Sequence, residues 1–517
     1  MAPKQDWYHP LTNYFEYFSL AAILLTGAFL RLWRIREYMT FLGDEGRDVL
    51  IVKRMIVDHD ITFLGPTASV GGFFLGPIYY YFITPFLWAF NLDPVGPAVM
   101  VALFGIATIG LVYIAGKHFY STTAALVASS LFAVSPVVIA YSRSSWNPNI
   151  VPFFSLLFVY SLSKAVEMHK KKWYFIAGSC IGIGLQLHYL FTFLIPVGVV
   201  FVLLYDRDGK RRIIQYAFAL AGCLAWLMPF IGFEIKNRFP NTLTIYRFIS
   251  AGKEVAFSGN PLSTVSGVVF RLFARLIFKF PPSEQLSIEL YDMDWWWRTG
   301  IIVAVVVTIA YALYRVFRFR KQADVLVGLW LLFGAGLFGF YQKAIYDYYF
   351  VIMFGLPFLL FGSLISICMN NRFVKWVSIA AVAVLLWFNW NGRPFIYPPN
   401  RQIEQVERIA REIYTMSGGR PYNFGLVTNG NSDHAYRFFL ESWGHPPVTI
   451  ENPDIDPPRQ TVTDQLVVLC EFPTCQPLGH PLWEIAGFGQ AEIDQELDIG
   501  LSMKVFRLVH ANGKMIQ

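Results

Sequence analysis

Four of the six residues in the stretch Gly43-Asp44-Glu45-Gly46-Arg47-Asp48 are charged, in a chain of which only 15% of the residues are. The stretch follows the first long apolar segment. A carboxylate at the rim of a dry pocket can accept a proton from a hydroxyl nucleophile, and a guanidinium group can bind a phosphate or an anionic head group. We therefore take Asp44 and Glu45 as candidate catalytic residues and Arg47 as a candidate anion ligand.

The same stretch also has a purely structural interpretation. Asp44 can cap the helix that follows it, because an N-cap carboxylate accepts a hydrogen bond from a free backbone N–H group. Asp48 is expected to be ordinary surface. Arg31 and Arg34, which precede the motif, are expected to pair with its carboxylates or to reach lipid phosphates.

Further candidates lie in three short turns between predicted membrane segments. They are a polar turn at 142–149 that can line a cavity, a histidine–tyrosine pair, and a lysine followed by tyrosines. The structural alternatives are a plain turn, a hydrogen-bonded histidine and tyrosine anchors at a membrane boundary. The candidates are Arg143, Asn147, His188, Tyr189, Lys343 and Tyr349. The sequence has no HExxH motif or paired histidine spacing, so a zinc site has no support.

The composition predicts a polytopic membrane protein that positions these residues. Of the 517 residues 55% are hydrophobic, and the mean hydropathy is +0.45. About eleven apolar segments are long enough to cross ~30 Å of hydrocarbon: 18–34, 95–116, 122–140, 150–167, 173–188, 190–205, 213–233, 299–316, 325–341, 347–367 and 374–391. The apolar run 74–90 is broken by Gly76, Pro77 and Pro85, which favours a tangential or re-entrant helix.

The lysines and arginines of the short loops predict the orientation of these segments. Fourteen lie in one set of alternate loops, at 117–121, 167–172, 206–212, 315–321 and 370–375, whereas the opposite short loops carry only Arg143 and Lys343. Because cytoplasmic loops are enriched in Lys and Arg, the acidic motif, the loop 234–298 and residues 393–517 are predicted to be extracytoplasmic. The net charge of +7 therefore reflects orientation and gives no support for nucleic-acid binding.

The polar regions have patterns of their own. Residues 47–59 and 265–280 alternate apolar with charged side chains, as helices at a membrane interface do. Residues 393–517 are polar and proline-rich, and follow the membrane domain 1–392. They predict a small α/β domain with helices at 401–416 and 434–443 and strands at 422–428, 465–470 and 501–509. In this domain a disulfide between Cys470 and Cys475 is allowed by the spacing but not required.

Several of these features together resemble a known family. An acidic pair follows the first transmembrane helix, with Arg47 three residues beyond Asp44. The stretch Gly76-Pro77-Ile78-Tyr79-Tyr80-Tyr81 opens the next hydrophobic segment, followed by 124–136, Ser142-Arg143 and, late in the chain, Asp347-Tyr348-Tyr349 with Pro357. Over residues 10–390 the chain resembles the membrane glycosyltransferases of the GT-C superfamily. Within it, the chain is similar to the branch of protein O-mannosyltransferases, the lipid A aminoarabinose transferase and the RgtA/B/C/D-like enzymes.

The resemblance implies a mainly α GT-C fold and an inverting transfer of a sugar from a polyprenyl-phosphate-linked donor to an acceptor hydroxyl at the extracytoplasmic face. It implies Asp44 as general base with Glu45 beside it, and Arg47 on the donor phosphate. Arg143, Lys343 and Tyr349 are weaker carry-overs into the same cavity, and His188, Tyr189 and Asn147 are candidate pocket residues.

The chain also departs from the family pattern. Phe74-Leu75-Gly76-Pro77 stands where many relatives have Lys-Pro-Pro, and Asn147 and Asn149 stand in a loop where many have an acidic residue. A metal or charged-sugar role tied to those elements is therefore not expected, and a neutral sugar is favoured.

The expected partners are membrane lipids, the lipid-linked donor and an acceptor glycan, lipid or protein, with no nucleic acid. No cofactor is certain, and a divalent metal has no sequence support. The expected location is the cytoplasmic (plasma) membrane.

Two alternatives come from other functional classes. A transporter or flippase of a lipid-linked saccharide would place charges within the membrane segments and often has matching halves. This sequence has apolar segments nearly free of charge and no matching halves. A non-catalytic assembly subunit would present residues 393–517 and would not need Asp44.

Overall fold

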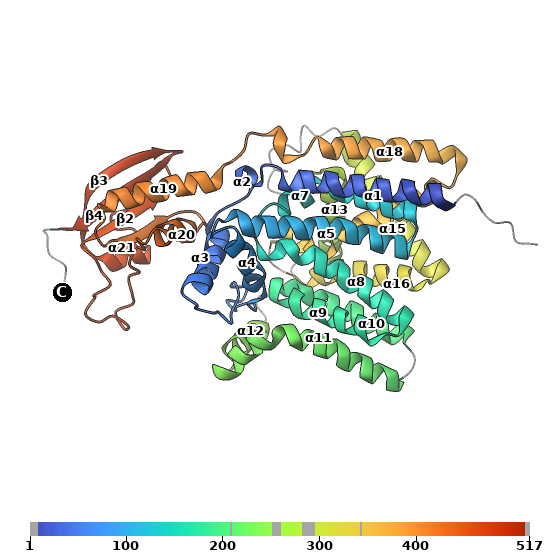
Figure 1. Cartoon of the computed structure of the whole chain (residues 1–517), viewed down its shortest axis with the longest axis horizontal. Coiled ribbons are helices and arrows are strands. Elements are labelled where there is room, and N and C mark those ends of the chain that lie inside the picture. The colour runs from blue at the N-terminus through green and yellow to red at the C-terminus, as the bar shows by residue number, and fades with distance from the viewer. Residues whose placement is uncertain (1–8, 207–208, 251–259, 282–294, 342–343, 512–517) are drawn as a thin grey trace, which may run out of the picture. The chain divides into compact units, whose positions relative to one another are not determined.

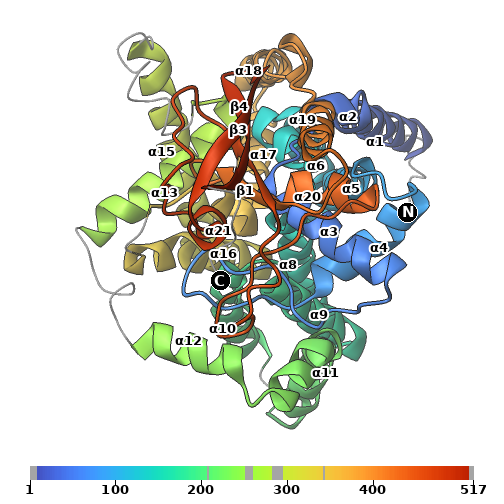
Figure 2. The same ribbon diagram turned by 90° about the vertical axis from the view of Figure 1, so that its left-hand side faces the viewer.

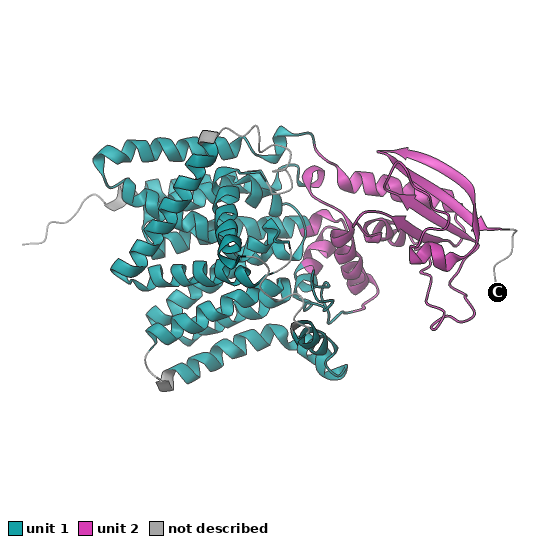
Figure 3. Ribbon diagram, turned by 180° about the vertical axis from the view of Figure 1, so that it is seen from behind, with its two compact units in different colours: residues 1–35, 61–82, 98–398 teal, residues 36–60, 83–97, 399–517 magenta. Residues whose placement is uncertain are grey.

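The computed structural model describes residues 9–206, 209–250, 260–281, 295–341 and 344–511. Its contacts divide the chain into two compact units (Figure 3), with residues 1–35, 61–82 and 98–398 in unit 1 and residues 36–60, 83–97 and 399–517 in unit 2. Unit 2 is thus assembled from segments far apart in the sequence. The acidic motif belongs to it, together with the C-terminal residues. The domain boundary between residues 392 and 393 stays a prediction.

Unit 1 is helical (Figure 1). Its α-helices are α1 (His9–Leu32), α6 (Thr122–Val134), α7 (Pro136–Tyr141), α8 (Val151–Met168), α9 (Lys171–Leu187), α10 (Ile195–Tyr205), α11 (Gly209–Lys236), α12 (Pro240–Ser250), α13 (Pro261–Phe278), α15 (Trp295–Phe319), α16 (Gln322–Gly336), α17 (Gly355–Cys368) and α18 (Arg372–Trp390), with most of α5 (Val95–Phe119). Short 3-10 helices interrupt them: η1 (Asn147–Ile150), η2 (Tyr189–Leu194), η3 (Leu337–Phe340), η4 (Asp347–Met353) and η5 (Pro394–Ile396).

Within the described ranges, eight helices are long and apolar enough to cross a membrane, or nine if η4 and α17, bent by 60°, form one span. All eleven predicted segments fall on helices. Five of these helices have fewer than 18 residues: α6 with 13, α9 with 17, α10 with 11, α16 with 15 and α17 with 14. The predicted segment 122–140 is broken at Ser135 because Pro136 begins α7. The chain is therefore a mainly α integral membrane protein.

Two helices qualify the predictions for the remaining hydrophobic runs. α4 (Ile78–Ala89) has 12 residues with Pro85 inside; at ~1.5 Å per residue it is too short to cross ~30 Å of hydrocarbon, as expected for a tangential segment. α13, predicted as an interface helix, is among the candidate spans. Its Arg271 and Arg275 bind Asp347, 2.8 and 2.6 Å away, instead of extending to lipid phosphates.

Unit 2 contains a mixed four-stranded sheet, drawn in red in Figure 2. The strands β1 (Asn423–Val427), β2 (Gln465–Cys470), β3 (Ala491–Gly500) and β4 (Met503–His510) lie in the order β1-β2-β4-β3. β1 and β2 are parallel and the other pairs are antiparallel. The helices of the unit are α2 (Ile35–Tyr38, from its second residue), α3 (Gly43–Val57), α19 (Gln402–Ser417), α20 (His434–Ser442) and α21 (Trp483–Phe488).

The predicted elements of the C-terminal region are confirmed, and two were missed. β1, β2, β4, α19 and α20 lie within two residues of their predicted bounds. β1 and β2 are buried along their whole length, which explains why residues 466–470 of β2 are apolar without alternation. The missed elements are β3 and α21. β3 is an edge strand with mostly exposed, acidic side chains, so it lacks the pattern of a half-buried strand.

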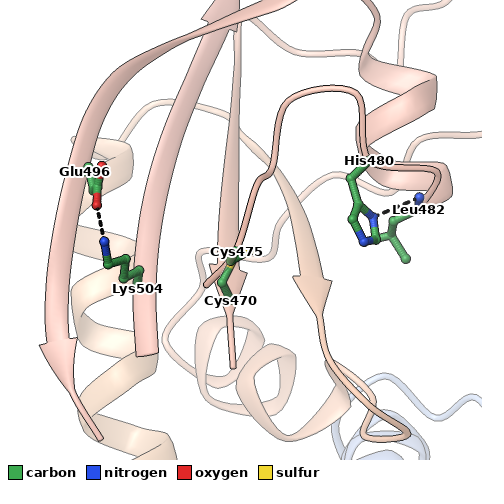
Figure 4. The surroundings of a disulfide bond; sticks show 6 residues. All are labelled: Cys470, Cys475, His480, Leu482, Glu496 and Lys504. Carbon is green, nitrogen blue, oxygen red and sulfur yellow. Dashed lines mark hydrogen bonds and ion pairs between the residues drawn. A yellow bond between two sulfur atoms is a disulfide. The ribbon is translucent and has the colours of Figure 1, made fainter. Parts of the chain in front are cut away.

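The disulfide that the sequence left open is formed between Cys470 and Cys475, with Cα atoms 6.0 Å apart (Figure 4). It ties the end of β2 to the loop that follows. Nearby, Lys504 of β4 forms an ion pair of 2.7 Å with Glu496 of β3 (Figure 4). The five residues that follow β2 thus form a short loop closed by the disulfide.

Candidate active site

The acidic motif forms the first turns of α3. Arg47 donates from Nη1 to Asp44 Oδ1 at 2.7 Å, and from Nη2 and Nε to Asp48 Oδ1 at 2.7 and 2.9 Å. The Asp44 side chain is 53% exposed, whereas that of Asp48 is 0% exposed. The prediction that Asp48 is ordinary surface is therefore wrong, because Asp48 is a buried anchor for Arg47. Asp44 is the carboxylate that remains accessible.

Glu45 lies beside Asp44 in a different environment. Its Oε2 accepts a hydrogen bond from the backbone N–H of Leu42 at 3.1 Å, so Glu45, and not Asp44, serves the start of the helix. Burial raises the pKa of Glu45 to about 7, and the charges of Asp44 and Asp48 act in the same direction. Two adjacent carboxyl groups with different environments are suited to different roles in proton transfer.

The start of α20 and the loop before it lie against this turn within unit 2. The backbone N–H of Gly43 donates to Asn431 Oδ1 at 3.0 Å. A Cβ atom on Gly43 would lie 2.2 Å from Ser432 Oγ, and one on Gly46 would lie 2.3 Å from the backbone nitrogen of Ala435. Sequence reasoning missed these neighbours. The spacing of Gly43 and Gly46, three residues apart on one helix face, is the signal that indicates such close packing.

In unit 1, Arg143 is 1% exposed and contacts backbone carbonyls. Its Nη1 and Nη2 donate to Leu30 O and Trp33 O, both at 2.8 Å, at the carboxyl end of α1. Arg31, fully buried, donates to Gly27 O at 3.1 Å and to Ala133 O of α6 at 3.0 Å. The expectation that Arg31 pairs with carboxylates or lipid phosphates is wrong, since backbone carbonyls of α1 and α6 accept its hydrogen bonds instead.

Tyr189 and Tyr349 belong to a group of tyrosines in unit 1 that we call the tyrosine cluster, and His188 lies beside it. Its members are Tyr189, Tyr341, Tyr346, Tyr348 and Tyr349. The Tyr189 and Tyr341 hydroxyls lie 3.1 Å apart, and Tyr341 donates to the Tyr349 hydroxyl at 3.3 Å. The His188 ring stacks on Tyr189, with ring centroids 4.8 Å apart. The cluster is therefore a group of neutral aromatic rings in which Tyr341 links the hydroxyls of Tyr189 and Tyr349.

The remaining candidates have separate places. The Asn147 side chain is buried and donates to Leu187 O at 2.6 Å, one residue before His188. Lys343 lies outside the described residues. Asp347, which precedes two tyrosines of the cluster, is bound by Arg271 and Arg275. These two arginines were not predicted as site residues, because only the fold brings α13 to η4.

Across the described part of the chain, no group of three or more His, Cys, Asp or Glu side chains is arranged to hold a metal ion. The candidate residues lie in two sets. Asp44, Glu45 and Arg47 belong to unit 2, and His188, Tyr189 and Tyr349, with Asn147 next to them, belong to unit 1. Arg143 contacts the end of α1.

Parts of the chain are similar in sequence to proteins described as mannosyltransferases. The family model described as dolichyl-phosphate-mannose-protein mannosyltransferase matches residues 75–233. The putative mannosyltransferases YkcB and YycA of Bacillus subtilis (strain 168) are 27% identical over 207 residues and 25% identical over 198 residues. These matches cover 39% and 38% of this chain. The chain spans only 28% of the length of each relative.

Solved structures match over more of the chain. ArnT from Cupriavidus metallidurans, bound to undecaprenyl phosphate, has a TM-score of 0.63 at 13% identity, covering 98% of this chain and 100% of that one. AglB from Archaeoglobus fulgidus, in complex with an inhibitory peptide and a dolichol-phosphate, has a TM-score of 0.55 at 12% identity, covering 89% and 70%. The fold is the GT-C fold, with a small C-terminal four-stranded sheet, and the resemblance to the GT-C superfamily is confirmed.

Proposed function

From a chain with the GT-C fold, we propose an inverting glycosyltransferase that moves a sugar from a polyprenyl-phosphate-linked donor to an acceptor hydroxyl on the extracytoplasmic face. The observation that carries the proposal is the pairing of Asp44, half exposed, with Arg47 in the first turns of α3. ArnT, which shares the fold, was solved with undecaprenyl phosphate, and AglB with a dolichol-phosphate. These ligands support a lipid phosphate as the leaving group here.

In the proposed reaction, the acceptor oxygen forms a bond to the anomeric carbon while the bond from that carbon to the phosphate oxygen breaks. Asp44 accepts the proton of the acceptor hydroxyl, and the lipid phosphate leaves with the bonding electron pair. Attack from the face opposite the phosphate inverts the anomeric configuration. The donor is already activated, so positioning, proton removal and charge neutralisation are sufficient.

Arg47 is the proposed partner of the departing phosphate. Its guanidinium group is fixed on one side by buried Asp48, which leaves it oriented near Asp44. Arg143, Lys343 and Tyr349 keep a proposed supporting role at the phosphate. Arg143 would have to release a helix carbonyl to take it. Arg271 and Arg275 add a second source of positive charge, because among the described residues both are paired with the single carboxylate of Asp347.

The tyrosine cluster, with His188 and Asn147 beside it, is proposed to line the sugar pocket. Aromatic faces and neutral hydroxyls suit an uncharged sugar, which has apolar C–H faces and hydroxyl groups. The extracytoplasmic placement is supported by the charges of the short loops. The disulfide between Cys470 and Cys475 supports it as well, since disulfides persist in oxidising compartments.

The test is transfer by purified protein in liposomes that contain a labelled polyprenyl-phosphate sugar. Asp44→Asn keeps the shape of the side chain and removes the base, so we expect transfer to fall by a factor of about 10² or more, with donor binding and melting temperature unchanged. Asp60→Asn, an exposed carboxylate beyond the end of α3, is the matched control and should transfer normally. Undiminished transfer by the Asp44→Asn protein would exclude the base assignment. Movement of the lipid across the bilayer without any transfer would favour a flippase.

A further inference from the structure

The C-terminal part of unit 2 holds the acidic turn by a chain of hydrogen bonds. The backbone N–H of Gly43 is one of the donors that a helix start leaves without an internal partner. Asn431 Oδ1 accepts from it at 3.0 Å and also accepts from Ser432 N at 2.9 Å. The residue after Gly43 is Asp44. The side chain of Asn431 therefore fixes the backbone next to the proposed base.

Asn431 is fixed in turn by Glu471. Its Nδ2 donates to Glu471 Oε1 at 2.8 Å, and the same oxygen accepts from the Tyr436 hydroxyl at 3.0 Å. The other Glu471 oxygen accepts from the Thr428 hydroxyl. Glu471 follows the last residue of β2, and its own N–H donates to Val427 O of β1 at 3.0 Å. The chain of hydrogen bonds thus runs from the sheet through Glu471 and Asn431 to Gly43.

Close packing gives the same turn little freedom to move away from α20. The ideal Cβ positions on Gly43 and Gly46 fall within 2.2 and 2.3 Å of atoms of Ser432 and Ala435. Backbone therefore lies against backbone at this crossing, which only glycine allows.

The far end of α3 is held by the same helix. Lys53 Nζ lies 2.9 Å from Glu441 Oε1, and Arg54 Nη2 lies 2.7 Å from Glu441 Oε2. Before α3, Phe41 packs edge-on against Phe438 and Phe439, with ring centroids 6.2 and 6.0 Å apart. α20 therefore fixes α3 at both ends, so that α3 is oriented by the C-terminal residues.

We propose that Asn431 is a positioning residue for Asp44, and that the C-terminal residues 399–517 serve to place the acidic motif for catalysis. The inference rests on the proposed function, because it assigns the placement of the proposed base. A base that is misplaced by about 1 Å loses on the order of 10²-fold in rate. The support of Gly43 by Asn431, backed by Glu471, is the kind of fixed shell that such placement requires.

A charge exchange along the hydrogen-bond chain tests the proposal. Asn431→Asp keeps the acceptor for Gly43 but sets two carboxylates against each other at the present contact with Glu471. We expect kcat to fall by about 10- to 100-fold with the donor KM unchanged. Adding Glu471→Gln restores a donor opposite the new carboxylate, so the N431D/E471Q protein should recover kcat to within a few fold.

The matched control is Asn423→Ala. Asn423 is a buried asparagine of the same unit, whose Nδ2 donates to Val448 O and Thr461 O, both at 2.9 Å, away from α3. Its loss should lower the melting temperature with kcat unchanged. The positioning role is excluded if kcat falls equally in the N423A and N431D proteins, or if the N431D protein keeps the wild-type kcat. It is also excluded if the N431D/E471Q protein has a kcat as low as that of the N431D protein.

Two additions keep the test decisive. If the N431D protein does not accumulate, Asn431→Ser removes the three side-chain hydrogen bonds of Asn431, to Gly43, Ser432 and Glu471, without a new charge. It should lower kcat in the same way, and an unchanged kcat then excludes the proposal. The D44N protein is measured alongside. Wild-type protein that transfers no sugar overturns the proposed function itself, and a fully active D44N protein overturns the assignment of Asp44 as base. An inactive D44N protein with a fully active N431D protein overturns only the positioning role.

Discussion

Arg143 of unit 1 and Arg47 of unit 2 differ in the groups that accept the hydrogen bonds of their guanidinium side chains. Arg143 is buried and donates to backbone carbonyls at the end of α1, where the partial negative charge of a helix terminus takes the place of a carboxylate. Arg47 is bound by two carboxylates, one buried and one half exposed. The charge of Arg143 is thus matched by the fixed dipoles of a helix end, whereas the charge of Arg47, next to the proposed base, is matched by titratable groups.

The largest expected effect tests the structural side of this comparison. Arg143→Met leaves the carbonyls of Leu30 and Trp33 without these donors, at about 1–3 kcal/mol each, so the melting temperature in detergent should fall strongly. Arg36→Met removes an exposed pair with Asp93, which is worth about 1 kcal/mol or less, and is the control. An equal fall in both proteins would contradict the distinction between buried and exposed arginines.

The next effect concerns the buried carboxyl group of unit 2. The pKa of Glu45 is raised to about 7 in the folded protein, so between pH 4.5 and 7 the folded state binds more protons than the unfolded state. Stability should therefore fall as the pH rises through this window, by on the order of 3 kcal/mol at its end. Melting temperatures of wild-type and Glu45→Gln protein between pH 4.5 and 8 measure it. Parallel curves would show that Glu45 does not titrate in this range.

Arg47→Ala is expected to weaken use of the donor more than use of the acceptor. A hydrogen bond to a charged group contributes about 1.5–3 kcal/mol, which corresponds to a donor KM higher by roughly 10- to 100-fold. Initial rates with varied donor and varied acceptor separate the two effects. A rise in the acceptor KM alone would show that Arg47 contacts the acceptor and not the donor, which contradicts its proposed role at the phosphate.

The smallest effect belongs to the tyrosine cluster. Tyr349→Phe removes the acceptor for the Tyr341 hydroxyl and should cost about 1 kcal/mol, seen as a modest rise in the donor KM. Tyr246→Phe, an exposed tyrosine of α12, is the control and should have no effect. A loss of activity as large as that of D44N would mean that the tyrosine cluster takes part in the chemistry together with the acidic turn.

Much of this architecture was predictable because it follows from local patterns. The apolar runs predicted the helices of unit 1, and β2 was predicted at its observed bounds because five apolar residues follow Gln465 and all six are buried. β3 was missed because an exposed edge strand with acidic side chains has no such pattern. The acidic motif stood out for a different reason, its concentration of charge in an apolar chain.

The partners of the candidate residues were not predictable in the same way. The carbonyls that bind Arg31 and Arg143 have no signature in a sequence, since every residue carries one. Asn431 and Glu471 are far along the chain from Gly43, and neither belongs to a motif. Only the spacing of Gly43 and Gly46 hinted that another backbone would lie against α3. The fold, and not residue chemistry, decided which carboxylate was surface and which was anchor.

The hydrogen bond between Gly43 and Asn431 joins residues 388 positions apart, which has a consequence for biosynthesis. At roughly 5–20 residues per second, the ribosome finishes the acidic turn about 20 to 80 s before it reaches the residue that supports this turn. During that interval a nascent chain carries Asp44 without its support. A polypeptide released before Asn431 and Glu471 is expected to keep Asp44 unsupported. Activity would therefore require that synthesis continue past these two residues.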